Sequence, residues 1–293
     1  MSFTRGYFAG TVTTLFAIGV YQYSRESSPQ SSQRDRPQLT DDVKEEIKRR
    51  ILRYGVPQRG CEPRVYTNHV ISYDQSKKTP VWVAELITQD TIQGTASRKH
   101  SNFMPDPSIP PLFSADNSDY RGSGWSRGHM APAGDNKFDQ KAMDDTFYLS
   151  NIVPQDIDNN AGFWNRFEMY CRDLAKRFDS VQVVSGPMVL PSTLNDRGQR
   201  VVTNPVIGQN EVAVPTHLYK VILVEADKRP IAIGCFIVPN EPIENKNSLK
   251  EFQVTLEEVQ KRTGVIFFPE LKNNNNLQGL CTVDSCVLGK RHR

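Results

Sequence analysis

Residues 125–178 constrain the fold of this 293-residue chain more than any other stretch. They open with a short strand-like run that contains Arg127 and His129, and a second strand is predicted over residues 147–152. An amphipathic helix follows, because apolar side chains recur every three or four residues at Trp164, Phe167, Cys171, Leu174 and Phe178. We expect this stripe to pack onto the two strands and to complete a compact strand–strand–helix unit.

The polar side chains of this unit are those needed to hydrolyse a phosphodiester. Asn160, near the predicted helix start, and Glu168 lie about 80° apart around the helix axis, and both offer hard oxygen donors of the kind that Mg²⁺ prefers. His129 has an ordinary pKa of about 6.5 and can take a proton from water near neutral pH. Arg127 presents a planar fork of N–H donors to phosphate oxygens.

These residues resemble the motif of the DNA/RNA non-specific ββα-metal (His-Me finger) nucleases, the family that includes mitochondrial endonuclease G and secreted bacterial nucleases. The family pattern is Asp-Arg-Gly-His, then Asn-x-x-Pro-Gln, then Asn and Glu on a helix. This chain matches it at Arg127, Gly128, His129, Asn151, Pro154, Gln155, Asn160 and Glu168. The resemblance covers about residues 65–269 and implies an α+β fold, with a ββα-metal nuclease core and a central, mostly antiparallel sheet flanked by helices.

The resemblance implies a Mg²⁺-dependent nuclease, with Mn²⁺ as a substitute metal, that cuts DNA and RNA to 5′-phosphate and 3′-hydroxyl ends. His129 would be the general base and Arg127 would bind the scissile phosphate. Asn160 would hold the metal directly, and Glu168 would hold it through a water molecule. Asn151 would support the catalytic site by hydrogen bonds. Family members are commonly homodimers, so a homodimer is expected here.

Two further substrate-binding residues follow from the same resemblance. Arg98 lies in a polar loop where the family has a second phosphate-binding arginine. Ser126 replaces the usual Asp and, together with residues 280–286, resembles the exonuclease/endonuclease G-like mitochondrial branch. Because serine is uncharged, we expect Arg127 to be freer than it is beside an aspartate. Members of that branch carry a helical extension, whereas this sequence ends at Arg293, so we expect a weak preference for DNA ends.

Two other classes of function stay open on the sequence alone. One is a catalytically inactive relative that only binds nucleic acid. The other is a Ser–His hydrolase that uses Ser126 or Ser185, although neither serine lies in a Gly-x-Ser-x-Gly elbow. More modest roles also remain for single residues, because Asn160 could cap a helix and Glu168 could pair with Arg172 one turn further on. The joint occurrence of the motif residues favours the nuclease.

The first 38 residues differ in character from the rest of the chain. Residues 6–24 contain no charged side chain, which approaches the lower length limit of a membrane-spanning helix. Together with the resemblance, we expect residues 1–23 to be a mitochondrial targeting segment or inner-membrane anchor, with the rest facing the intermembrane space. A cleaved secretory signal is the alternative. Residues 24–38 should be a flexible linker and residues 39–293 the nuclease domain.

The remaining elements follow from local patterns. Thr40 should cap a helix over residues 41–54, and Thr255 and Glu258 should form a capping box for a helix that ends at Gly264. Strands are predicted over residues 67–74, 80–88, 181–184, 217–224 and 231–238. The net charge of +3 permits a polyanionic partner. Five cysteines, only Cys281 and Cys286 of them close together, favour free or buried thiols.

Overall fold

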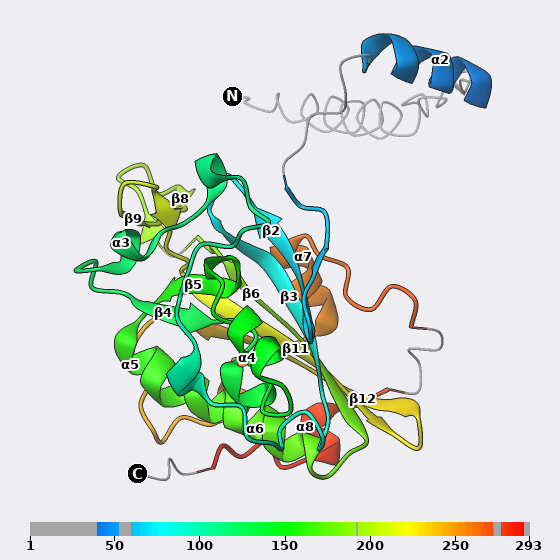
Figure 1. Cartoon of the computed structure of the whole chain (residues 1–293), viewed down its shortest axis with the longest axis vertical. Helices are drawn as coiled ribbons and strands as arrows, with labels where there is room; N and C mark the ends of the chain where they lie inside the picture. Colours follow the sequence, from blue (N-terminus) through cyan, green and yellow to red (C-terminus); the bar gives the residue numbers. More distant parts are fainter. Residues whose placement is uncertain (1–39, 53–59, 192, 272–276, 290–293) are drawn as a thin grey trace, which may run out of the picture. The chain divides into compact units, whose positions relative to one another are not determined.

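The computed structural model describes residues 40–52, 60–191, 193–271 and 277–289. The predicted anchor (1–23) and linker (24–38) lie outside these residues, and no helix within them has the length and apolarity needed to span a bilayer. The chain divides into two units, Met1–Pro57 and Gln58–Arg293. In the first unit the described element is helix α2 (Asp41–Ile51), which begins directly after Thr40, as predicted (Figure 1).

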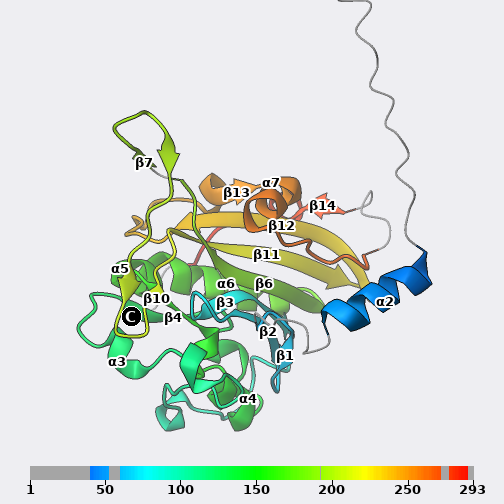
Figure 2. The same ribbon diagram turned by 90° about the horizontal axis from the view of Figure 1, so that it is seen from above.

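The second unit is built on an antiparallel sheet, which confirms the predicted α+β class (Figures 1 and 2). Its strands lie in the order β1-β2-β3-β6-β11-β12-β13, with β14 added parallel to β12. Their bounds are β1 (Arg64–Val65), β2 (His69–Asp74), β3 (Thr79–Ile87), β6 (Ser180–Met188), β11 (His217–Ala226), β12 (Arg229–Pro239), β13 (Gln253–Val254) and β14 (Gln278–Gly279). Both predicted hairpins, β2–β3 and β11–β12, are present.

Helices cover both faces of the sheet (Figure 2). Because side chains alternate along a strand, β11 supplies both layers of the core. Leu218 and Ile222 pack in the cluster that contains the apolar stripe of α6 (Asn165–Ala175), whereas Tyr219 and Val221 pack in the cluster that contains Val259 of α7 (Leu256–Thr263). The sheet is thus buried on both sides, and α6 is fixed to it by its apolar face.

Helix α7 keeps its predicted ends but only half of its predicted capping box. The Thr255 hydroxyl accepts a hydrogen bond from the backbone N–H of Glu258 at 3.1 Å, and Gly264 ends the helix with a φ of 70°. The other half does not form, because the Glu258 carboxylate pairs with Arg262 one turn on.

The strand–strand–helix unit is present, with one correction to its second strand. Strand β4 (Ser126–His129) pairs antiparallel with β5 (Ile152–Gln155). The predicted strand over residues 147–152 is wrong for residues 147–151. Phe147 lies in a turn, Tyr148 makes an isolated bridge with Met104, and the next three residues form the 3₁₀ helix η4 (Leu149–Asn151). Tertiary contacts override the apolar pattern there, because the Asn151 side chain bonds to the backbone of Thr146, at the start of the turn, and to that of Ala131, just after β4.

The helix that follows β5 is not a single α-helix. It begins as α5 (Ile157–Asn159), continues as the π-helical turn η5 (Asn160–Trp164) and becomes α6 at Asn165. Phe178, predicted as the last residue of the apolar stripe, lies beyond the end of α6. The smaller elements are η1 (Arg98–His100), η2 (Pro111–Phe113), α3 (Asn117–Tyr120), η3 (Ala133–Asp135), α4 (Gln140–Asp145), β7 (Thr193–Leu194), β8 (Arg200–Val201), β9 (Val206–Ile207), β10 (Val212–Ala213), η6 (Leu249–Phe252) and α8 (Leu280–Val283).

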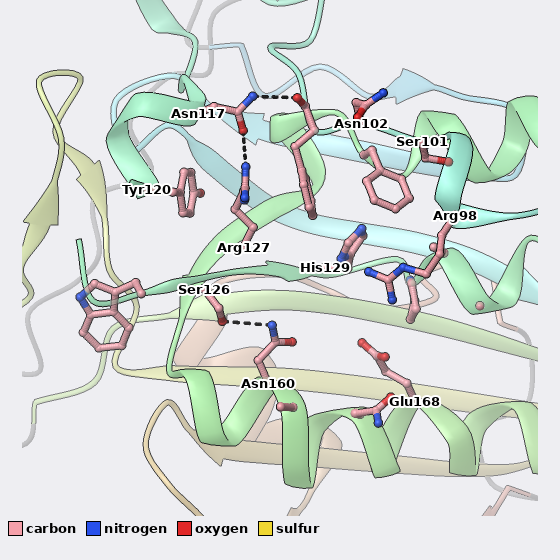
Figure 3. A pocket seen from close by; sticks show the side chains of 18 of the residues that line it. Arg98, Ser101, Asn102, Asn117, Tyr120, Ser126, Arg127, His129, Asn160 and Glu168 are labelled. Carbon is pink, nitrogen blue, oxygen red and sulfur yellow. Dashed lines mark hydrogen bonds between the residues drawn. The ribbon is translucent and has the colours of Figure 1, made fainter. Parts of the chain in front are cut away.

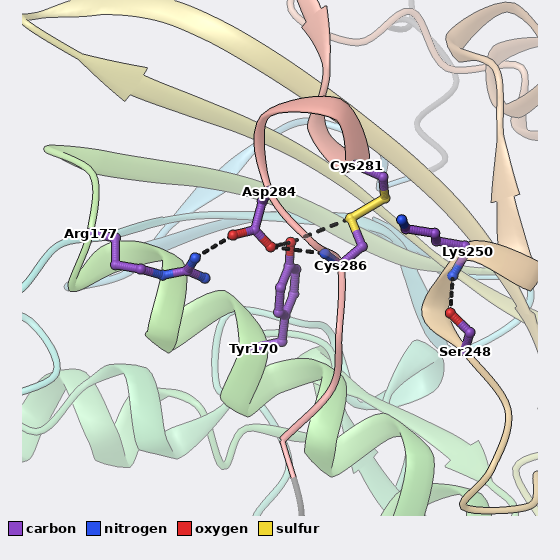
Figure 4. The surroundings of a disulfide bond; sticks show 7 residues. All are labelled: Tyr170, Arg177, Ser248, Lys250, Cys281, Asp284 and Cys286. Carbon is purple, nitrogen blue, oxygen red and sulfur yellow. Dashed lines mark hydrogen bonds and ion pairs between the residues drawn. A yellow bond between two sulfur atoms is a disulfide. The ribbon is translucent and has the colours of Figure 1, made fainter.

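A disulfide joins Cys281 and Cys286, so the expectation of free thiols is wrong for this pair (Figure 4). The turn at the end of α8 brings their Cα atoms to 5.2 Å, within the range that a disulfide spans. Between the two cysteines, Asp284 accepts a hydrogen bond from the Tyr170 hydroxyl at 2.7 Å and pairs with Arg177. The C-terminal segment is thereby tied to α6 and the residues that follow it.

Candidate active site

One pocket of about 1020 Å³ gathers most of the predicted site residues (Figure 3). The motif residues that line it are Arg98, Ser126, Arg127, His129, Asn160 and Glu168. They come from four places in the chain: the short helix η1, strand β4, the π turn η5 and helix α6. The pairing of β4 with β5 and the packing of α6 on the sheet fix the walls of this pocket relative to each other.

His129 sits between two aromatic rings. Its imidazole centroid lies 5.3 Å from that of Phe103 and 5.0 Å from that of Phe147, which meets it edge-on. Burial, followed by the positive charge of Arg98, lowers the pKa of His129 to about 3, so the ring is neutral at physiological pH. Its Nε2 atom is buried without a partner, which leaves Nδ1 as the nitrogen able to reach a water in the pocket.

Arg127 is held from two sides. Its Nη1 donates a hydrogen bond to Oδ1 of Asn117 at 2.6 Å, and its Cζ lies 4.4 Å from the ring centroid of Phe103. Arg127 is therefore held by two residues outside the motif, and whether it is freer than beside an aspartate stays a prediction. The Ser126 hydroxyl instead donates to the backbone carbonyl of Gln155 at 2.8 Å.

Asn160 is oriented by the same serine. Its Nδ2 donates to Oγ of Ser126 at 3.0 Å (Figure 3). Because an amide has its donor and acceptor on opposite arms, this bond leaves Oδ1 of Asn160 available to the pocket. The geometry therefore presents the carbonyl oxygen, which is the arm that can ligate a cation.

Glu168, two turns beyond Asn160 along the helical segment, supplies the second oxygen donor. Burial raises the pKa of its carboxyl group to about 7. The surface pair with Arg172 considered from the sequence does not form as a hydrogen bond, because Nη1 of Arg172 donates to Asp135 at 2.6 Å. An amide oxygen and a half-buried carboxylate, both hard donors on one pocket, fit a Mg²⁺ or Mn²⁺ ion that keeps several waters. Among the described residues, no three His, Cys, Asp or Glu side chains gather as a metal-binding group.

The other two predicted residues take different positions. Arg98 lines the pocket, with its Cζ 6.0 Å from the Phe147 ring centroid, and its charge favours the ionised form of Glu168. Asn151 is fully buried and outside the pocket lining. Its side chain accepts from the N–H of Ala131 and donates to the carbonyls of Ala131 and Thr146, at 2.8 to 2.9 Å, and so secures the backbone just after His129.

The serine-hydrolase alternative finds no support in these contacts. Ser126 bonds to Gln155 and Asn160, and Ser185 is buried and accepts a hydrogen bond from Lys220 at 2.7 Å. Neither hydroxyl is hydrogen-bonded to His129, as a serine nucleophile requires.

The motif did not reveal the residues that surround it. Asn117 lies in the stretch 105–124, which reads as a long loop suited to substrate contact without singling out any residue, and Phe147 was predicted in a strand. Nothing in the sequence singles out Phe103. The one local signal was Asp116, a good helix N-cap that fixes the start of α3 at Asn117. Asp116 predicts where α3 begins, but it does not predict that Asn117 lines the pocket.

Comparison with known proteins gives a consistent set of relatives. The family model described as DNA/RNA non-specific endonuclease matches residues 47–274. The chain is 56% identical to the human mitochondrial nuclease EXOG over 241 residues, which are 81% of this chain and 65% of the human protein. Mouse mitochondrial nuclease EXOG is 50% identical over 98% of this chain and 78% of its own length. The crystal structure of the EndoG/EndoGI complex contains a chain that is 39% identical, with a TM-score of 0.71 over 79% of this chain and 94% of that one.

Proposed function

Because the chain belongs to the DNA/RNA non-specific endonuclease family, we propose that it is a metal-dependent mitochondrial nuclease that hydrolyses phosphodiester bonds in DNA and RNA. The products would carry 5′-phosphate and 3′-hydroxyl ends. The observation that carries the proposal is the convergence on a single pocket of the neutral histidine, the two arginines and the two oxygen donors that the sequence predicted. The relatives named mitochondrial support the compartment.

In this mechanism His129 acts as the general base. Its low pKa keeps the ring unprotonated, so Nδ1 accepts a proton from the water that attacks phosphorus. Arg127 and Arg98 bind the non-bridging oxygens of the phosphate and hold it in line with that water. Oδ1 of Asn160 would hold a Mg²⁺ ion directly, and Glu168 would hold it through a water molecule. When bound, the ion supplies positive charge to the phosphate and to the leaving 3′-oxygen.

The finer placement of the protein is also a proposal. We infer from the uncharged run at residues 6–24 that the N-terminal segment attaches the nuclease to the mitochondrial inner membrane, with the catalytic domain in the intermembrane space. A homodimer is proposed because members of the family are commonly homodimers.

Digestion of matched substrates tests this function. Supercoiled circular DNA and 5′-labelled linear DNA are incubated with the full chain and Mg²⁺, with and without excess EDTA. We expect circles to be cut, cutting to stop in EDTA, and Mn²⁺ to restore it. Cleavage that survives EDTA would contradict a metal-dependent nuclease. Binding of DNA without cleavage in any metal would identify an inactive relative.

A further inference from the structure

We propose that Asn117 and Phe103 are positioning residues that hold the guanidinium of Arg127 in its phosphate-binding orientation. The inference rests on the proposed function and adds to it two side chains from outside the motif. Figure 3 shows Asn117 with a hydrogen bond on each of its two polar arms, one of them to Arg127. The other bond goes to the backbone carbonyl of Phe103.

The amide of Asn117 uses both of its polar ends. Oδ1 accepts from Nη1 of Arg127 at 2.6 Å, and Nδ2 donates to the backbone carbonyl of Phe103 at 2.7 Å. Since both arms are engaged, the amide cannot rotate without losing a hydrogen bond. One edge of the guanidinium is thereby fixed to the loop that carries Phe103.

The ring of Phe103 fixes the face of the same guanidinium. The Cζ atom of Arg127 lies 4.4 Å from the ring centroid, within cation–π range. The same ring also contacts His129, at a centroid distance of 5.3 Å, and Phe147, at 4.9 Å. Phe103 therefore stands between the general base and the phosphate-binding arginine and sets their spacing.

Uncharged contact partners suit an arginine that binds phosphate. An acidic partner would offset the guanidinium charge, whereas an amide and an aromatic ring orient it and leave the charge to the substrate. Ser126 does not serve this purpose, because its hydroxyl bonds to the Gln155 carbonyl and to the Asn160 amide. Asn117 and Phe103 thus orient the guanidinium of Arg127, whereas Ser126, its neighbour in the motif, does not.

The test is a set of mutant cycles on kcat/KM for a short DNA duplex in Mg²⁺. N117A and F103L are each measured in the wild-type and R127A backgrounds, and F103Y tests rescue by a ring of similar shape. Loss of one such contact should lower kcat/KM about tenfold. In the R127A background N117A should cost less than about twofold, because residues that act through one partner are not additive. F103L should lose less there than in the wild-type background and keep only the part of its effect that comes from the contact with His129. F103Y should recover most of the loss seen in F103L.

Two matched controls lie outside the pocket lining. N68A removes an amide that donates at 2.8 Å to Asn136, and F252L removes a ring that packs edge-on against Phe163. Both should keep wild-type kcat/KM. If F103L does not fold, N117A alone completes a cycle with R127A.

The outcomes separate this inference from the proposed function. Losses equally large in both backgrounds, or no loss in N117A and F103L, would overturn the positioning role and leave the nuclease mechanism intact. Full activity in R127A itself would overturn both the assignment of Arg127 and this inference.

Discussion

At the scale of single residues, His129 and His69 show how loss of solvation decides charge. His129 lines the pocket, and its low pKa keeps it neutral, as a general base must be. His69 is buried in β2 and stacks on Tyr66 at a ring-centroid distance of 4.7 Å. Both ring nitrogens of His69 lack a partner, and burial lowers its pKa to about 4. On the sequence alone, only the motif around His129 distinguishes the roles of these two histidines.

His69 yields a prediction about stability and pH. Its folded pKa lies below its unfolded value of about 6.5, so acid protonates the unfolded state first and wild-type stability falls as pH drops from about 6.5 towards 4. The variant H69F keeps the stack and removes this proton uptake. Relative to wild type, H69F should therefore gain about 2 kcal/mol in unfolding free energy between pH 7 and pH 5. Denaturant unfolding at the two pH values measures it, and a pH-independent difference would contradict the buried neutral ring.

At the scale of elements, the patterns that depend on local periodicity were predicted well. The β2–β3 and β11–β12 hairpins and helix α7 lie close to where alternation, turn residues and caps placed them. Elements set by long-range contacts were missed. The 3₁₀ turn η4 ends at Asn151, whose side chain bonds to the backbone of Ala131, and the π turn η5 ends at Trp164, whose indole N–H donates to the His129 carbonyl. Such distant contacts carry no periodic signal in the sequence.

The π turn yields the prediction at this scale. The turn η5 already carries one residue more than an α-helical turn, so insertion of a further alanine after Gly162 should rotate Asn160 by about 100° relative to Glu168. We expect this insertion to abolish Mn²⁺ binding, measured by electron paramagnetic resonance, and DNA cleavage with it. The control is G162A, whose Cβ would meet nothing within 4 Å and which should bind and cut normally. An insertion variant that still binds Mn²⁺ like wild type would show that η5 does not set the site.

At the scale of the whole molecule, the site depends on segments far apart in sequence that the sheet brings together. The motif residues could be named from the sequence because the family pattern is dense. The residues that orient Arg127 could not be named from the sequence, because Asn117 and Phe103 reach Arg127 only after the loop before α3 folds over the pocket. The disulfide was missed for a related reason: two cysteines five apart pair only when a turn aligns them.

The disulfide leads to a prediction for the C-terminal segment. Removing this short cross-link with C281S/C286S should lower the unfolding free energy by about 2 kcal/mol, the chain-entropy value for so small a loop. Reductant should lower wild-type stability by a similar amount and leave the double variant unchanged. The control is C61S, which replaces an exposed free thiol and should have no effect. Equal stability of wild type with and without reductant would indicate that the bond does not contribute.

The cleavage rate of H129A on supercoiled DNA in Mg²⁺ tests the central claim most directly. If His129 is the general base, its removal should lower the rate by about a hundredfold or more, while DNA affinity and Mn²⁺ binding stay near wild type. H100A is the matched control, since His100 is exposed on η1 and outside the pocket lining. A rate in H129A above about a tenth of wild type would contradict the account.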